Sequence, residues 1–308
     1  MLLNILLLIA GFVLLIKGAD YFVDGSSALA NRMHIPPIII GLTIVAMGTS
    51  APEAAVSISS AIQGSNAIAI GNVLGSNIAN ILFILGLTAF ICPLAVQKNT
   101  VKYEIPLVVF VTAILCAMGW KYGIISHTSA RILIAMFICF LGYLYVLAKK
   151  SPESADEIKP MGNIKIALCI ILGIVALVVG SKITVASSCD IARYIGVSER
   201  IIGLTLVAIG TSLPELVTSV IAARKGEADI AIGNIVGSNI FNILFVLGIA
   251  GLILPIPFDS AFLFDGAVAI LVAILLWMCT FRKMRLGRNA GMLFMLLYAA
   301  YLIFLIIQ

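Results

Sequence analysis

GLTIVAMGTSAPE at residues 41–53 is repeated as GLTLVAIGTSLPE at residues 203–215, 162 positions further along the chain. A second pair of segments keeps the same shift, since AIAIGNVLGSNIANILFILG at 67–86 matches DIAIGNIVGSNIFNILFVLG at 229–248. Over residues 41–88, 28 of 48 positions are identical at this shift, without a gap. The shared residues include Gly, Thr, Ser, Pro, Glu and Asn, which an apolar composition cannot match by chance. The sequence therefore predicts two copies of one structural unit.

The composition indicates where these units reside. Of the 308 residues, 62% are hydrophobic and only 11% are charged, whereas about 25% are charged in a soluble domain. Apolar runs near 20 residues recur along the chain, and each is long enough to cross a bilayer. We therefore expect a polytopic membrane protein rather than a soluble domain with an unusually apolar core. The net charge of +5 reflects loop placement, and no nucleic-acid partner is expected.

Ten membrane-spanning helices are predicted, with a polar segment after the fifth. The segment KKSPESADEIKPMGN at 149–163 divides the chain in half and is too short to fold as a domain of its own. We expect a first five-helix repeat at 1–148, a cytoplasmic linker at 149–163 and a second five-helix repeat at 164–308. The predicted spans are 2–30, 36–62, 67–91, 103–120, 129–148, 164–192, 198–223, 229–254, 261–280 and 289–307.

The basic residues predict how these spans are oriented. Thirteen of the nineteen Lys and Arg residues fall in the odd-numbered connections, four fall in the even-numbered ones, and Lys17 and Lys182 lie within spans. The positive-inside rule then predicts a cell-membrane protein with cytoplasmic odd-numbered connections and both termini outside.

Five spans per unit make the second unit enter the membrane from the opposite side. The two units should then be related by a pseudo-two-fold axis in the membrane plane. The predicted fold is an all-α polytopic membrane protein of ten transmembrane helices, arranged as two inverted five-helix repeats with broken helices 2 and 7.

Each unit carries one glutamate in the middle of an apolar span. A charge at mid-bilayer costs about 3 kcal/mol or more, and no Lys or Arg lies within a helical turn of Glu53 or Glu215. A bound cation is the natural partner. Pro52 and Pro214 interrupt the helical hydrogen bonds and free backbone carbonyl groups nearby.

Hydroxyl and amide oxygens accompany both glutamates. They come from Thr49, Ser50, Ser76, Asn77 and Asn80 in the first unit and from Thr211, Ser212, Ser238, Asn239 and Asn242 in the second. Calcium takes about 6–8 such hard oxygen ligands, and sodium accepts a similar set, whereas a His or Cys cluster for zinc or copper is absent.

The charge of the two glutamates suggests how ions compete. Two carboxylates neutralise one divalent or two monovalent cations, and competition for one set of oxygens is the physical basis of antiport. A buried carboxyl group can also take up a proton, so a proton-coupled mechanism stays open.

GTSAPE with GSNIAN, repeated as GTSLPE with GSNIFN, resembles the alpha repeats of the sodium/calcium exchanger family, within the cation/calcium exchanger superfamily. The chain is similar to short prokaryotic-type members. The resemblance implies a ten-helix inverted-repeat fold and exchange of extracellular sodium for cytosolic calcium, with no cofactor and no enzymatic activity. Proton-coupled calcium exchangers of the superfamily have a different, GNAxE-like signature around their glutamates, which this sequence lacks.

The resemblance also implies which residues hold the ions. Calcium would be bound by Glu53 and Glu215 with the backbone carbonyls of Thr49 and Thr211. The sodium sites would add Ser50, Ser76, Ser212, Ser238 and the carbonyls of Ala46 and Ala208, while Asn80 and Asn242 would line the centre. Some family members carry Asp where Asn242 stands, and one branch with Asp there is potassium-dependent, so Asn242 argues against potassium coupling.

Three other functions remain as alternatives. The first is a calcium, or other divalent cation, antiporter of the same fold that is coupled to protons. The second is an ion channel, although channels usually gain their symmetry by oligomerising around a pore. The third is an intramembrane enzyme, for which no His-Glu metal pair or Ser/Lys dyad is evident. Besides the ions, the expected partner is the lipid bilayer, and a monomer could suffice.

A few charged residues lie in the first span. Lys17 and Asp20 are three residues apart and share a helix face, so a local ion pair is expected. Asp24 lies nearer the membrane surface, where water would solvate it. Alternatively, Lys17, Asp20 and Lys182 stabilise one gating state of helices 1 and 6.

Overall fold

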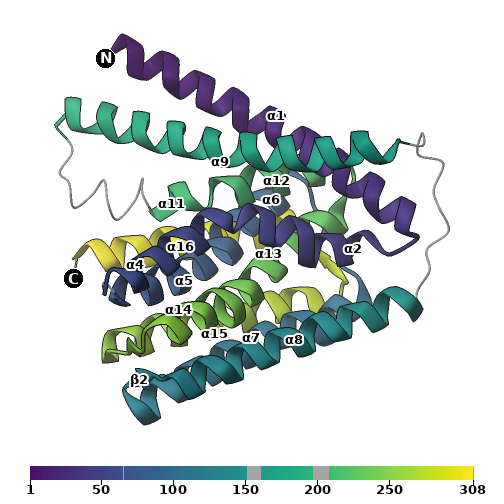
Figure 1. The fold of residues 1–308 in the computed structure, drawn as a ribbon. Helices are drawn as coiled ribbons and strands as arrows, with labels where there is room; N and C mark the ends of the chain where they lie inside the picture. The colour runs from purple at the N-terminus through teal and green to yellow at the C-terminus, as the bar shows by residue number, and fades with distance from the viewer. Residues whose placement is uncertain (65, 151–160, 197–207, 308) are drawn as a thin grey trace.

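The computed structural model describes residues 1–64, 66–150, 161–196 and 208–307. Within this part, eight helices are long and apolar enough to cross a membrane, and the bent pair Pro37–Thr49 and Ala51–Ile62 forms a further span with a 52° break. The chain is thus an all-α polytopic membrane protein (Figure 1). The predicted seventh span begins in residues outside the described part, and its remainder forms two short helices.

The elements of the first half follow the predicted spans closely. They are α1 (Leu2–Met33), α2 (Pro37–Ile40), η1 (Gly41–Val45), α3 (Ala46–Thr49), α4 (Ala51–Ile62), α5 (Asn66–Ala79), η2 (Asn80–Leu85), α6 (Gly86–Ile91), β1 (Leu94–Ala95), η3 (Thr100–Glu104), α7 (Ile105–Tyr122), β2 (Ile124–Ile125) and α8 (His127–Lys150). The η segments are π-helical turns within longer helices.

The second half repeats this order where it is described. Its elements are α9 (Asn163–Tyr194), α11 (Ala208–Thr211), α12 (Leu213–Arg224), α13 (Ala228–Phe241), η5 (Asn242–Val246), α14 (Leu247–Ile253), β3 (Ile256–Pro257), α15 (Ser260–Phe281), β4 (Arg285–Leu286) and α16 (Arg288–Ile307). Helices dominate because a lipid environment leaves backbone polar groups no partners outside their own segment.

Local sequence signals explain where the helices end. After α1, His34 takes a left-handed conformation (φ 54°), and its backbone N–H donates to the carbonyls of Ala30 and Asn31. Pro36 and Pro37 follow and cannot continue the same helix. After α7, Gly123 adopts φ 62°, which costs a glycine little because it lacks a Cβ.

Two long helices, α1 and α9, lie beside each other along one side of the remaining helices (Figure 1). Their contact depends on glycines, since a Cβ added at Gly18 would lie 3.0 Å from the carbonyl oxygen of Gly173, and one at Gly11 would lie 3.1 Å from that of Gly180. Rising numbers on α1 meet falling numbers on α9, so the helices are antiparallel. At the 162-residue shift, Gly11 corresponds to Gly173 and Gly18 corresponds to Gly180, so the shift converts one contact into the other. A two-fold relation between inverted units requires this.

Two short strand pairs repeat this symmetry at the membrane surfaces. β1 pairs with β4, and β2 pairs with β3, both antiparallel. The first pair joins the connection after the third span to the connection after the ninth, and the second pair joins the connections after the fourth and eighth. Connections predicted to share a membrane face therefore do meet one another.

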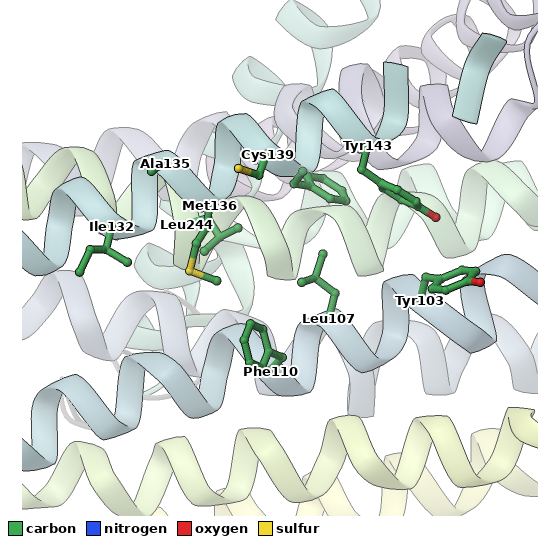
Figure 2. Close-up of a pocket in the computed structure, with 10 residues that line it drawn as sticks. Tyr103, Leu107, Phe110, Ile132, Ala135, Met136, Cys139, Tyr143 and Leu244 are labelled. Atoms are coloured by element: carbon green, nitrogen blue, oxygen red, sulfur yellow. The ribbon is translucent and has the colours of Figure 1, made fainter. Parts of the chain in front are cut away.

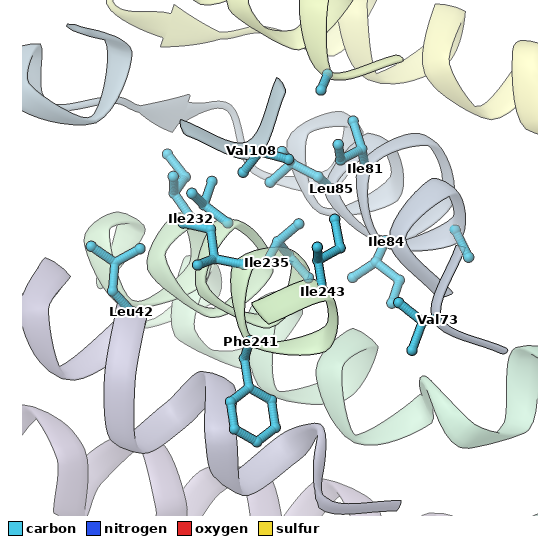
Figure 3. Packing of buried hydrophobic residues seen from close by; sticks show 14 of the residues in the cluster. Leu42, Val73, Ile81, Ile84, Leu85, Val108, Ile232, Ile235, Phe241 and Ile243 are labelled. Carbon is cyan, nitrogen blue, oxygen red and sulfur yellow. The ribbon is translucent and has the colours of Figure 1, made fainter. Parts of the chain in front are cut away.

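The core is centred on α13. Every residue of this helix from Ile230 to Phe241 is buried. Figure 3 shows apolar side chains of α13 and η5, such as Ile232 and Ile235, with Leu42 and Ile81 from the first half near them. The central helices of the two halves thus share one core, which encloses the polar residues of both repeats.

The expected ion pair within the first span is wrong. Within the described residues, no ion pair joins Lys17 to Asp20. Instead, Lys225 Nζ, just after α12, lies 2.5 Å from Asp20 Oδ1 and 2.6 Å from Asp24 Oδ1. Asp24 is therefore paired rather than simply solvated. Ser27 also donates a hydrogen bond to Glu227, so α1 is tied to the turn between α12 and α13 of the other half.

Candidate functional site

The second and seventh spans break at equivalent serines. Ser50 lies between α3 and α4 with φ −78° and ψ 8°, and Ser212 lies between α11 and α12 with φ −91° and ψ 8°. A proline follows two residues later, in the first turn of each new helix, where its missing N–H is tolerated. The glutamates come next, so each carboxylate lies at a helix N-terminus, where the helix dipole favours negative charge.

The two glutamates are joined across the repeats by these serines. Ser50 Oγ donates to Glu215 Oε1 at 2.7 Å, and Ser212 Oγ donates to Glu53 Oε1 at 3.0 Å. The bonds exchange under the 162-residue shift. Both glutamates are buried, with at most 1% of their surface exposed. No Lys or Arg in the described part of the chain forms an ion pair with either one.

Four buried oxygens at this centre have no hydrogen-bond partner. They form two symmetric pairs, Glu53 Oε2 with Glu215 Oε2 and Asn80 Oδ1 with Asn242 Oδ1. A buried polar atom without a partner costs free energy, and such atoms are rare in native proteins. All four are hard oxygen acceptors, two of them from carboxylates, so a cation would satisfy the whole set. The donor set therefore fits a calcium- or sodium-sized ion.

Helix packing places the segments that carry the asparagines against the helices that carry the opposite glutamates. η2, which begins at Asn80, packs against α12, which carries Glu215. η5, which begins at Asn242, packs against α4, which carries Glu53. The π-helical turns start at these asparagines, and such turns often occur at functional sites. The sequence predicted both residues as central but did not predict this change in helical hydrogen bonding.

Asn77 and Asn239, one turn before these asparagines, form a reciprocal pair. Asn77 Nδ2 donates to the backbone carbonyl of Asn239 (3.1 Å), and Asn239 Nδ2 donates to that of Asn77 (3.3 Å). Their Oδ1 atoms accept hydrogen bonds from the amide groups of Asn242 (3.2 Å) and Asn80 (3.0 Å). The oxygens of Asn77 and Asn239 therefore already accept hydrogen bonds within the protein. These residues are not free ion ligands, although the sequence had placed them among the possible oxygen ligands.

A second layer holds the backbone of the glutamates. Asn72 Nδ2 donates to the carbonyl of Glu53 (3.3 Å) and to Ser57 Oγ (2.9 Å). Asn234 makes the same two bonds to Glu215 and Ser219, at 3.3 Å and 2.9 Å. This layer was not predicted, although its signal is present in the sequence: an Asn follows Gly in both GNVLG and GNIVG, and both serines are identical at the shift.

The remaining predicted residues lie around the same breaks. Thr49 Oγ1 donates to Asn234 Oδ1 at 2.8 Å, and Ser238 Oγ donates to the carbonyl of Ala46 at 3.4 Å. Both contacts join residues of opposite repeats. Ser76 is buried in α5, Thr211 ends α11 and is half-buried, and Ala208 begins α11.

Two further acidic side chains in the spans were not predicted. Glu104 accepts a hydrogen bond from the Tyr143 hydroxyl, and Asp265 Oδ1 accepts one from Tyr301 Oη at 2.9 Å. Each pair joins the fourth and fifth spans of its own repeat. Each hydrogen bond holds two neighbouring peripheral helices together. Neither acidic residue belongs to the central cluster, the group of polar residues around Glu53 and Glu215.

A groove of about 580 Å³ between α7 and α8 is a poor candidate for an ion site (Figure 2). Its lining is apolar except for Tyr103 and Tyr143 at one end, and it contains no carboxylate or amide side chain. Such a surface suits lipid chains rather than ions. The central cluster is therefore the candidate site.

Comparisons with known proteins agree over nearly the whole chain. A family model described as Sodium/calcium exchanger protein matches residues 3–147 and 165–307. Inner membrane protein YrbG of Escherichia coli (strain K12) is 37% identical over 305 residues, which cover 95% of this chain and 94% of that protein. Sodium/calcium exchanger MaX1 of Methanosarcina acetivorans is 32% identical over 343 residues, covering 98% of each. The solved structure of sodium-calcium exchanger NCX_Mj soaked with zero Na⁺ and Ca²⁺ aligns with a TM-score of 0.86 at 32% identity, covering 99% of each chain.

Proposed function

The chain belongs to the sodium/calcium exchanger family, a family of cation/calcium antiporters, and from this premise we propose that it exchanges sodium for calcium across the cell membrane. Exchange proceeds by alternating access to one midplane site. The proposed ligands are Glu53, Glu215, Asn80, Asn242, Ser50, Ser212, Ser76 and Ser238, with the backbone carbonyls of Thr49, Thr211, Ala46 and Ala208.

One observation carries this proposal: the four buried oxygens of Glu53, Glu215, Asn80 and Asn242 that have no hydrogen-bond partner. They occur in symmetric pairs, and they come from both inverted repeats. Five other buried side-chain oxygens in the described residues also lack a partner, but only these four form pairs related by the 162-residue shift. These four oxygens, two of which belong to carboxylates, remain available to bind an ion. They support a cation site that is shared by the two halves.

The charge of the site accounts for antiport. Two carboxylates balance either one calcium ion or two sodium ions, because the low-dielectric interior disfavours a net charge. Each ion species excludes the other from the same oxygens. Because both glutamates are buried, an ion bound there exchanges with water only after the helices around it move.

Proton coupling is the second candidate. Neither carboxylate forms an ion pair with a basic group in the described residues, and a proton could neutralise such a group as well as a metal ion can. In that case the chain would be a calcium, or other divalent cation, antiporter of the same fold. The counter-ion therefore decides between two versions of one mechanism.

The test is calcium uptake into sealed proteoliposomes that contain the purified protein. We expect uptake when sodium inside is diluted into sodium-free medium, and none when only a pH gradient is imposed. A protonophore should leave the sodium-driven uptake unchanged. Uptake that follows the pH gradient and ignores sodium would favour the proton-coupled antiporter instead.

The proposed orientation follows from the basic residues. In it, 1–148 and 164–308 are the inverted repeats, 149–163 is a cytoplasmic linker, and both termini are outside. Fusion of a fluorescent protein to the C-terminus tests this in a bacterial host, because green fluorescent protein exported through the general secretory route does not fluoresce. A brightly fluorescent fusion would contradict the orientation.

A further inference from the structure

The amide group of asparagine has two unlike ends, and only its oxygen can bind a cation. Asn80 and Asn242 are therefore useful ligands only if the protein controls which end faces the ion. Both side chains are buried, so water does not settle their orientation. The neighbouring groups must do so.

Backbone carbonyls fix the first step of that control. The side chain of Asn77 faces the carbonyl of Asn239, and the side chain of Asn239 faces the carbonyl of Asn77. A carbonyl only accepts hydrogen bonds, so each of these asparagines must turn its NH₂ group toward it. Their Oδ1 atoms then point to the other side.

The second step follows from the first. Asn77 Oδ1 accepts from Asn242 Nδ2, and Asn239 Oδ1 accepts from Asn80 Nδ2. The opposite orientation would bring two oxygens together in a site without water, where repulsion is strong. The NH₂ groups of Asn80 and Asn242 are therefore held, and their oxygens remain as the buried atoms without a partner.

We propose that Asn77 and Asn239 are positioning residues that turn the amide oxygens of Asn80 and Asn242 toward the transported ion, each acting on the asparagine of the opposite repeat. The inference rests on the proposed function, because it takes the ion to bind at these oxygens. Residues 77 and 239 are equivalent at the 162-residue shift and bond to each other, so they face each other across the pseudo-two-fold axis. One reciprocal pair thus orients a ligand in both repeats.

The test is a set of calcium dissociation constants for purified protein, measured by equilibrium binding of radioactive calcium. Asn77→Ala releases the amide of Asn242, and loss of one orienting hydrogen bond should weaken calcium binding about tenfold. In an Asn242→Asp background the same change should not weaken binding, because a carboxylate has two equivalent oxygens. Asn77→Ser serves as a second variant should Asn77→Ala fail to fold.

The symmetric change supplies the matched control. Asn239 orients Asn80, so Asn239→Ala should still weaken calcium binding about tenfold in the Asn242→Asp background. In an Asn80→Asp background, Asn239→Ala should not weaken calcium binding. Equal losses in all backgrounds would reduce Asn77 and Asn239 to general structural residues and overturn the inference. Unchanged binding in both single variants would overturn it as well.

This readout is separate from that of the proposed function. Calcium binding measured without sodium and at one fixed pH involves no counter-transport, so the predicted pattern can hold even if uptake proves to be proton-coupled. Conversely, sodium-driven uptake with no background-dependent pattern would leave the function standing and remove the orienting role of Asn77 and Asn239.

Discussion

At the residue scale, the site is a set of polar contacts, most of which cross between repeats. Ser50 bonds to Glu215, Ser212 to Glu53 and Thr49 to Asn234. Each repeat therefore completes the hydrogen bonding of the other's polar residues, and the proposed ligand shell needs both repeats. Cross-repeat bonds also mean that relative motion of the halves must change the geometry of the ligands.

The serines provide a prediction about sodium. Ser50→Ala and Ser212→Ala each remove a donor to a carboxylate, which is worth about 1.5–3 kcal/mol, and a proposed sodium ligand. We expect the sodium concentration for half-maximal calcium uptake to rise about tenfold or more in both variants.

Ser59→Ala is the control for these variants, since Ser59 lies on the exposed side of α4 and accepts a side-chain hydrogen bond from Gln63. It should leave the sodium dependence unchanged. An effect confined to one of the two site serines would contradict their symmetric role.

Much of this residue-level site could be predicted from the sequence, because the polar residues repeat at one shift within apolar spans. The orientation of the asparagine amides could not be predicted, since it depends on which backbone carbonyls lie opposite Asn77 and Asn239. The roles of Asn72 and Asn234 were not predicted, because a polar residue beside a glycine is equally consistent with a helix-packing motif.

At the element scale, α1 and α9 pack through glycines, as η1 and α13 do at Gly41 and Gly233. A Cβ at Gly18 would come within 3.0 Å of both the Gly173 carbonyl and the Leu177 backbone nitrogen. The two backbones therefore approach closely and present few interlocking side chains. Such a smooth contact is compatible with sliding of one helix along the other.

Gly18→Leu tests the close approach. The added side chain must separate α1 from α9, so we expect a loss of about 1–3 kcal/mol in stability, measured as a lower midpoint of thermal unfolding in detergent. Gly142→Leu is the matched control, because a Cβ at Gly142 of α8 has no atom within 4 Å. Equal loss in both variants would mean that the α1–α9 contact is not specially tight.

Ion pairs between α1 and the turn after α12 provide a second prediction at this scale. Burial lowers the pKa of Lys225, but hydrogen bonds and charges from Asp20 and Asp24 raise it more, so the net pKa lies above its ordinary value of 10.5. The folded state holds this proton more tightly than the unfolded state does. The pairs therefore stabilise the fold fully below pH 10.5 and lose this effect as pH rises through the folded pKa.

Comparison of the wild type with Lys225→Met by thermal unfolding measures this effect. We expect a difference in stability of about 1 kcal/mol or less, because the pairs are partly exposed. The difference should be constant from about pH 8 to pH 10 and shrink above that range. A difference that already vanishes near pH 8 would show that the ion pairs do not cause it.

The position of Lys225 also shows where prediction from the repeat stops. At the 162-residue shift its counterpart is Gln63, an uncharged residue whose side-chain amide donates to Ser59 of the preceding helix. The ion pairs therefore break the symmetry of the molecule, and no pattern in one repeat could have indicated them. The spacing of Lys17 and Asp20 suggested a local pair, but tertiary packing brought Asp20 to a different partner.

At the scale of the whole molecule, one two-fold relation accounts for most of the structure. It exchanges the glycine contacts of α1 and α9, the two strand pairs and the serine–glutamate bonds. This relation was predictable because five spans per unit invert the second unit. In the proposed function, it places the ion site where the two halves meet, which suits access from either face in turn.

The central claim is that Glu53 and Glu215 together hold the transported ions. Its most direct test is sodium-driven calcium uptake by proteoliposomes that contain Glu53→Gln, Glu215→Gln or Glu104→Gln. The third variant alters a carboxyl group that is equally buried but lies outside the site. We predict that the first two variants reach the membrane folded but take up no calcium above background, while Glu104→Gln keeps wild-type uptake. Full uptake by either of the first two variants would contradict the claim.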